Sequence, residues 1–189
     1  PNDDAGYDAL CDGLLPRGEL AIWEVMTSNE RYLPQDLGLC YDWVEIKNIS
    51  NEAVDLGNYT LTDDPDSPLL FKLPAVTLQP GATHIIFLSG NTALGVNHAP
   101  FALNAAKDRL LLYGEKLVDY VYLQNIPVGM SYGRTEGIGG FSYMEPSPKN
   151  PNRAGYREIS GMPTSQYAPG VYSGETFTLE LTAKGDIYY

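Results

Sequence analysis

The chain has 189 residues, of which 43% are hydrophobic and 19% are charged, so it has enough apolar side chains for a core and is not a disordered acidic segment. Twelve Lys and Arg residues against 24 Asp and Glu residues give a net charge of −12. This charge excludes nucleic acids and anionic membranes as expected partners, because both are bound through Lys and Arg. No apolar run approaches the roughly 20 residues that cross a bilayer, so we expect no membrane insertion.

The residue usage indicates a β-rich chain with many turns. Gly and Pro contribute 19 and 14 residues, and Tyr, which suits half-buried strands, contributes 14. The length allows one domain and part of another. Since the chain begins at Pro1, without an initiator Met or a signal peptide, we interpret it as a processed or excised piece.

Short strands separated by turns are expected after an acidic lead-in at residues 1–18. One of them alternates, with Val44 and Ile46 on one face and Trp43 and Glu45 on the other. A helical alternative exists at residues 104–121, but Gly114 and the β-branched and aromatic residues after it favour a hairpin. The number and spacing of the strands predict an antiparallel sandwich. The predicted strands are 20–26, 41–48, 53–61, 69–73, 84–88, 109–113 and 116–123.

The composition changes in the last third of the chain. Gly137-Ile138-Gly139-Gly140 and the Pro-rich residues 145–152 cannot continue a central strand. We therefore expect a linker at 154–161 and a second β segment at 162–189, which contains an alternating stretch at 176–182. This segment is too short to bury a core of its own, so it packs on the first domain or begins a truncated second module.

Residues 19–153 carry a series of motifs in the order found in one family. The longer motifs are Ile22-Trp23-Glu24-Val25, Asp42-Trp43-Val44-Glu45-Ile46-Lys47-Asn48 and Leu56-Gly57-Asn58-Tyr59-Thr60-Leu61-Thr62-Asp63. The shorter motifs are Ser28-Asn29, Leu73-Pro74, Leu78-Gln79-Pro80-Gly81, Phe101-Ala102-Leu103, Val118-Asp119, Ser131-Tyr132-Gly133-Arg134 and residues 148–152. Together they resemble the lamin tail domain, which is found in nuclear lamins and in many secreted bacterial proteins. This chain departs from the family at Trp23, where the family has Asn.

The resemblance implies an all-β fold, an immunoglobulin-like antiparallel β-sandwich followed by a short C-terminal β segment of a truncated second module. That segment is similar to the opening of the C-terminal module of chitobiase and β-hexosaminidase, through Met162-Pro163-Thr164-Ser165, residues 169–172 and residues 177–182. This order of modules resembles the front of bacterial surface proteins that carry a spore-coat-H-type kinase domain further on. The resemblance implies an extracellular or cell-surface location.

The residues that carry catalysis in other proteins are sparse here. His84 and His98 are the only histidines, and no G-x-S-x-G nucleophile pattern occurs. Gly137-Ile138-Gly139-Gly140 lacks the spacing and the following helix of a phosphate-binding loop. We therefore expect that the chain is not an enzyme.

One acidic loop is a weak candidate for Ca²⁺. Asp63, Asp64 and Asp66 offer three carboxylates within four residues. The loop lacks the D-x-D-x-D-G spacing and a distal bidentate Glu, so the alternative is a solvated turn in which Asp63 caps backbone N–H groups. Apart from this weak Ca²⁺ candidate, we expect no cofactor.

Two acidic residues lie in predicted strands among apolar neighbours. A buried carboxylate without a partner is costly, so Glu24 and Glu45 each need donors. The planar guanidinium of Arg134 suits a carboxylate, and we predict that it pairs with Glu24 or Glu45. We expect Asn48 and Asp63, like Glu24, Glu45 and Arg134, to have a structural rather than a functional role.

Cys11 and Cys40 are the only cysteines, and no C-x-x-C spacing exists for a zinc site. A secreted location, which the resemblance implies, permits oxidation, so we predict a disulfide between Cys11 and Cys40. Two buried free thiols are the alternative.

These observations predict a non-catalytic binding or scaffolding module of a secreted or cell-surface bacterial protein, present as a monomer, with a protein or a glycan as its partner. The alternative is a glycan-binding accessory module of an extracellular hydrolase. An exposed line of Tyr or Trp spaced for sugar rings favours the alternative. An intracellular role at the nuclear lamina follows only from the family name, and the acidic charge argues against it.

Overall fold

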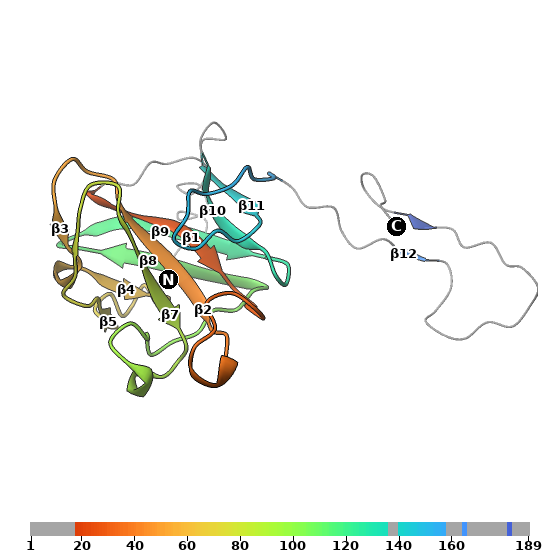
Figure 1. The fold of residues 1–189 in the computed structure, drawn as a ribbon, viewed down its shortest axis with the longest axis horizontal. Coiled ribbons are helices and arrows are strands. Elements are labelled where there is room, and N and C mark those ends of the chain that lie inside the picture. Colours follow the sequence, from red (N-terminus) through yellow and green to blue (C-terminus); the bar gives the residue numbers. More distant parts are fainter. Residues whose placement is uncertain (1–17, 136–139, 158–163, 166–180, 183–189) are drawn as a thin grey trace, which may run out of the picture. The chain divides into compact units, whose positions relative to one another are not determined.

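The structure is a computed structural model that describes residues 18–135, 140–157, 164–165 and 181–182. The chain forms two compact units, Pro1–Arg157 and Glu158–Tyr189 (Figure 1). The boundary between the units falls inside the linker expected at 154–161.

In the second unit, strand β12 (Thr164–Ser165) pairs antiparallel with strand β13 (Leu181–Thr182). Strand β13 falls within the alternating stretch at 176–182. The rest of the expected module at 162–189 lies outside the described residues.

The first unit contains two main antiparallel sheets. The five-stranded sheet has the order β11 (Gly140–Met144), β10 (Ser131–Thr135), β1 (Leu20–Met26), β2 (Asp42–Asn48) and β7 (Thr83–Leu88). The four-stranded sheet has the order β5 (Phe71–Lys72), β4 (Thr60–Thr62), β8 (Lys107–Tyr113) and β9 (Leu117–Gln124). A short pair, β3 (Val54–Asp55) and β6 (Thr77–Leu78), completes the fold. The predicted class is confirmed, since the sheets are antiparallel and the described residues contain no α-helix.

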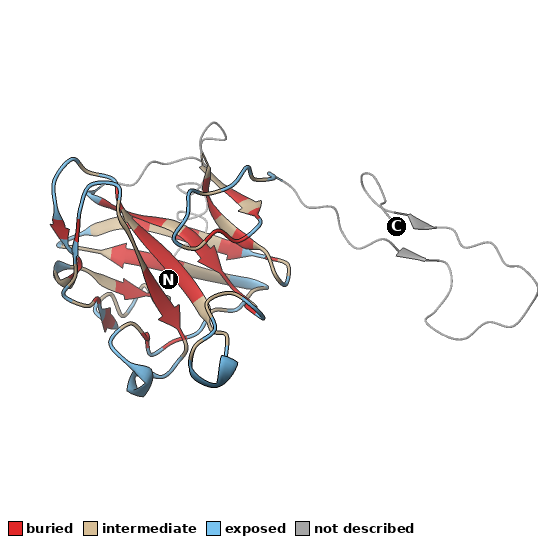
Figure 2. Ribbon diagram, viewed as in Figure 1, coloured by how far each residue is buried: buried red, intermediate tan, exposed pale blue. Residues whose placement is uncertain are grey.

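One apolar core lies between the two sheets, and Figure 2 shows the buried strands that form it. Ile22 and Ile46 of the five-stranded sheet and Leu61, Leu110 and Leu112 of the four-stranded sheet have no exposed surface. Each such side chain contributes about 1.5–3 kcal/mol to stability when it leaves water. The core therefore fixes which face of each strand points inward.

The five-stranded sheet is buried on its outer face as well. There Met26, Trp43, Ile85 and Phe87 form a second apolar cluster, which the loop between β1 and β2 covers. A β-bulge in β1, where the register against β2 shifts between Ile22 and Glu24, turns Glu24 and Met26 to this outer face.

Most predicted strands are present, and the hairpin interpretation of residues 104–121 is confirmed by the β8–β9 pair. The strand expected over 53–61 is instead interrupted by a 3-10 helix, η2 (Leu56–Asn58). The Asp55 carboxylate caps this turn by accepting a hydrogen bond from the Gly57 N–H at 2.9 Å. Three strands of the first unit were not predicted as such, β6, β10 and β11; β11 lies at the edge of its sheet, where a glycine-containing stretch is tolerated.

Candidate functional site

Arg134 is bound by a carboxylate, but that carboxylate belongs to Asp119 rather than to Glu24 or Glu45. The Arg134 Nη2 lies 2.7 Å from the Asp119 Oδ1, and both side chains are buried. The prediction of the partner was wrong because Glu24 and Glu45 point to the outer face of the sheet, whereas Arg134 points toward strand β9.

Glu24 and Glu45 are cross-strand neighbours on that outer face, and both are fully buried. Glu24 accepts hydrogen bonds from the Ser131 hydroxyl, the Ser147 N–H at 2.9 Å and the Ser147 hydroxyl at 3.1 Å. Glu45 accepts through Oε1 from the Lys149 N–H at 2.7 Å and the Thr83 hydroxyl at 3.0 Å, while its Oε2 has no hydrogen-bond partner. Burial raises the pKa of each carboxyl above its ordinary value.

The two carboxylates hold the C-terminal strap, which we define as residues 145–156. Beyond Ser147 and Lys149, the strap is held by the Asn152 side-chain amide, which donates to the carbonyls of Trp23 at 3.1 Å and Arg134 at 2.8 Å. At the end of the strap, Tyr156 exchanges two backbone hydrogen bonds with Tyr143 of β11. Glu24 and Glu45 therefore have a structural role. Their carboxylates accept hydrogen bonds from backbone N–H groups of the strap, which have no partner in a sheet.

Asn48 is also structural in its contacts. Its amide donates to the carbonyls of Glu52 at 2.7 Å and Leu78 at 2.9 Å, and its Oδ1 accepts from the Ser50 N–H at 2.9 Å. The buried side chain thereby joins the end of β2 to β6.

The acidic loop forms a turn in which Asp64, not Asp63, is the capping residue. The Asp64 carboxylate accepts from the Asp66 N–H at 3.0 Å and from the Ser67 hydroxyl at 2.9 Å. Among the described residues, no group of three or more His, Cys, Asp or Glu side chains is arranged to hold a metal. Burial and the neighbouring Asp108 and Asp64 carboxylates raise the pKa of Asp63.

Cys40 is a free, half-buried thiol in the structure, and its Sγ lies 3.9 Å from the Gly38 carbonyl oxygen. Its expected partner, Cys11, lies outside the described residues. The disulfide between Cys11 and Cys40 therefore stays a prediction, which a thiol titration of the denatured, unreduced protein decides.

The two tryptophans and His98 pack against other side chains. Trp43 has no exposed surface, and the Lys47 ammonium lies 3.7 Å from the centroid of the half-buried Trp23 ring. His98 is buried and stacks on Phe87 with 4.9 Å between ring centroids. Burial lowers the pKa of His98.

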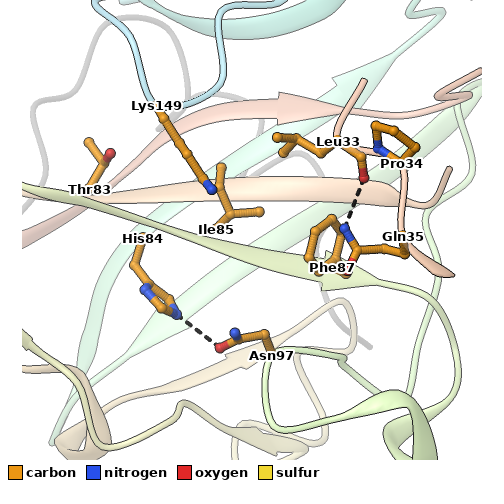
Figure 3. A pocket seen from close by; sticks show the side chains of 9 residues that line it. All are labelled: Leu33, Pro34, Gln35, Thr83, His84, Ile85, Phe87, Asn97 and Lys149. Atoms are coloured by element: carbon orange, nitrogen blue, oxygen red, sulfur yellow. Dashed lines mark hydrogen bonds between the residues drawn. The ribbon is translucent and has the colours of Figure 1, made fainter. Parts of the chain in front are cut away.

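A pocket that the sequence did not indicate lies along β7. We call it the β7 pocket, and its volume is about 580 Å³. Figure 3 shows the Lys149 side chain extending from the strap toward β7, and His84 with its Nε2 2.9 Å from the Asn97 Oδ1. The pocket is lined by Leu33, Pro34, Gln35, Thr83, His84, Ile85, Phe87, Asn97 and Lys149. Four separate segments supply these residues, so no local sequence pattern predicts the pocket. Of the lining residues, only Lys149 lies in one of the family motifs, the one at 148–152.

The β7 pocket has one cation, Lys149, and the Asn97 amide as a further donor, since the Thr83 hydroxyl donates to Glu45 and the Gln35 amide donates to the Leu33 carbonyl at 2.9 Å. Among the described residues no carboxylate lies within ion-pair distance of the Lys149 ammonium. The Asn97 Oδ1 is engaged by His84, which leaves its amide N–H groups to face a ligand. Such a lining favours a ligand that carries an acceptor or a negative charge.

The two loops beside the pocket expose aliphatic side chains. The loop that supplies Leu33 continues to Leu37, which is 98% exposed, and to Leu39. The loop that ends at Asn97 carries Leu94 and Val96, the latter 75% exposed. Both loops, with helices η1 (Asp36–Gly38) and η3 (Thr92–Leu94), lie at the same end of the sandwich (Figure 1). Exposed apolar side chains gathered in this way are typical of protein interaction surfaces.

Comparison with known proteins gives one family. The model described as Lamin Tail Domain matches residues 16–124, which include strands β1 to β9. The match ends before β10, β11 and the strap, although these complete the same sandwich. No curated protein matches the chain. In the described part of the chain, no helix has the length and apolarity required to span a membrane.

Proposed function

Because the chain belongs to the lamin tail domain family, with residues 16–124 of its 189 residues matched, we propose that it is a non-catalytic binding module whose ligand site is the β7 pocket. The observation that carries this proposal is the position of Lys149. An ammonium without an ion-pair partner among the described residues lies beside a pocket, on a chain with a net charge of −12. The buried carboxylates of Glu24 and Glu45, by contrast, are occupied by the strap.

The exposed apolar side chains favour a protein partner over a glycan. The large exposed hydrophobics of the described residues are mainly Leu, Ile and Val, and Tyr156 is the one aromatic among them. Sugar rings are bound by flat aromatic faces, whereas aliphatic side chains pack against other side chains. A glycan-binding accessory module of an extracellular hydrolase is the second candidate, and the amide and Phe87 side chains of the pocket are the observation in its favour.

The location and the second module belong to the same proposal. A secreted or cell-surface bacterial protein agrees with the acidic surface, and residues 158–189 would begin a module similar to the C-terminal module of chitobiase, ahead of a spore-coat-H-type kinase domain. The module is a monomer that holds or binds its neighbours.

A binding experiment tests the site. The ¹⁵N-labelled chain of 189 residues is titrated with a pool of random linear peptides, with chito-oligosaccharide and with oligogalacturonate. We expect amide shifts at the lining residues with the peptides, lost in Lys149→Met and kept in the matched control Lys72→Met, an exposed lysine on β5. Shifts that are absent, or that survive Lys149→Met, contradict the assignment of the pocket. Shifts with the oligosaccharides alone support the second candidate.

A further inference from the structure

The base of the β7 pocket is the free edge of β7, and the ladder with β2 shows which backbone groups that edge presents. The Asn48 N–H donates to the Ala82 carbonyl at 2.9 Å, one residue before β7 begins. In an antiparallel ladder, pairs that exchange hydrogen bonds alternate with pairs that do not. The N–H and C=O groups of Thr83, Ile85 and Phe87 therefore point away from β2, toward the edge.

The outward-pointing N–H and C=O groups of Phe87 already form hydrogen bonds. Its N–H donates to the Asn97 carbonyl at 2.8 Å, and its carbonyl accepts from the Ala99 N–H at 2.8 Å. The two bonds form a parallel bridge between Phe87 and His98. A segment in extended conformation thus already docks on β7 at one residue.

The remaining part of the edge is open. The chain before Asn97 leaves β7 through a turn at Gly95, which has φ of 138°, a value that favours glycine. In the described part of the chain, no hydrogen bond reaches the outward N–H and C=O groups of Thr83 and Ile85. Four backbone groups are therefore available next to the pocket, two donors and two acceptors.

The surroundings of this edge fit a peptide in extended conformation. Leu33 and Pro34 form an apolar wall beside Ile85, and Lys149 supplies a positive charge. We infer that the free edge of β7 binds an extended polypeptide segment as an added strand, paired to Thr83 and Ile85, with an acidic side chain at Lys149. This inference rests on the proposed binding function and names the class of its partner.

A pair of variants isolates the backbone contact. Proline at an outward-facing edge position removes one donor and leaves the ladder with β2 intact, so Thr83→Pro loses the outward N–H, whereas Thr83→Ala keeps it. Both variants lose the hydroxyl that donates to Glu45. Linear heptapeptides are selected from a random displayed library on the wild-type chain of 189 residues and then measured on all three chains. We expect Thr83→Pro to bind them about tenfold more weakly than Thr83→Ala, which lacks the same hydroxyl but keeps the outward N–H.

Peptides with methylated backbones make the test independent of the folding of Thr83→Pro. Each selected peptide is synthesised with N-methyl groups on its odd or on its even residues, and both forms are measured on the wild-type chain. A strand presents alternate N–H groups to its partner, so one form should lose binding and the other should keep it. In the bound state, hydrogen exchange at the Ile85 amide should slow at least tenfold. Equal affinity of both methylated forms, or an unchanged exchange rate at Ile85, overturns strand addition.

Other occupants give distinct results. A second copy of this chain on the same edge would slow exchange at Ile85 with rising protein concentration and without peptide, which overturns the peptide assignment. Binding of oligogalacturonate that is lost in Lys149→Met but unaffected by Thr83→Pro overturns strand addition and leaves the pocket function standing. If no heptapeptide is enriched over an unrelated bait and no oligosaccharide binds, both the inference and the proposed function fail.

Discussion

Arg134 on β10 and Asp119 on β9 form a buried ion pair that joins the two sheets and binds both backbone groups of Ile22. The Asp119 Oδ2 accepts from the Ile22 N–H at 2.8 Å, and the Arg134 Nε donates to the Ile22 carbonyl at 3.1 Å. Strand β10 pairs with β1 only from Glu24 onward. Beside the bulge, the Asp119 and Arg134 side chains therefore form the hydrogen bonds with Ile22 that a neighbouring strand would otherwise form. Burial raises the pKa of Asp119, and the Arg134 charge opposes that rise.

Replacing Arg134 by Met should destabilise the fold by about 3–5 kcal/mol, because Asp119 then remains buried without its countercharge. The double variant Arg134→Met/Asp119→Leu should recover part of this loss, since it also removes the buried Asp119 carboxylate that has lost its countercharge. Urea denaturation of the three chains measures both values. An Arg134→Met chain as stable as wild type would contradict the structural role of the pair.

The stability of the fold should depend on the ionisation of Glu45. Because burial raises its folded-state pKa, the contribution of Glu45 is largest at and below about pH 4.5 and falls as the pH rises through the raised pKa. Thermal melts of wild type and Glu45→Gln from pH 4 to pH 8 measure this effect. As the pH rises, the melting temperature of wild type should fall relative to that of Glu45→Gln. The exposed Glu115→Gln is the control; the same trend there would assign the effect to general charge repulsion.

The strap should be required for the sandwich, and the residues after it should not. A chain ending at residue 157 keeps every contact of Ser147, Lys149 and Asn152 and should melt cooperatively, as should a chain ending at 153. A chain ending at 144 leaves Glu24 and Glu45 without these donors and should lose the cooperative melt. Circular dichroism measures all three, and a stable chain ending at 144 would show that the strap is dispensable.

Asn48 should tolerate no acidic replacement. In Asn48→Asp, a carboxylate would face the carbonyls of Glu52 and Leu78 in a buried site, and we expect a loss of about 2–4 kcal/mol. The exposed Asn51→Asp, three residues along the chain, should change stability by less than about 0.5 kcal/mol. Guanidinium denaturation compares the two chains, and similar losses would contradict the role of the Asn48 amide.

The local patterns predicted the strands whose residues alternate or are continuously apolar. Strand β1 matches its predicted range, and the alternation of Val44 and Ile46 against Trp43 and Glu45 matches the burial of β2 on both faces. Strand β6 has two residues and β11 follows a glycine run, so neither produces a periodic signal strong enough to predict.

The sequence by itself determined the all-β class, the family motifs and the need for Glu24, Glu45 and Arg134 to have partners, because burial of charge has a cost that is the same in any fold. Which partner each residue has was decided only by the tertiary structure. The bulge in β1 turns Glu24 outward to the strap, while Arg134 points between the sheets to Asp119. The β7 pocket likewise exists only once four distant segments meet beside one strand edge, and no local pattern encodes such a meeting.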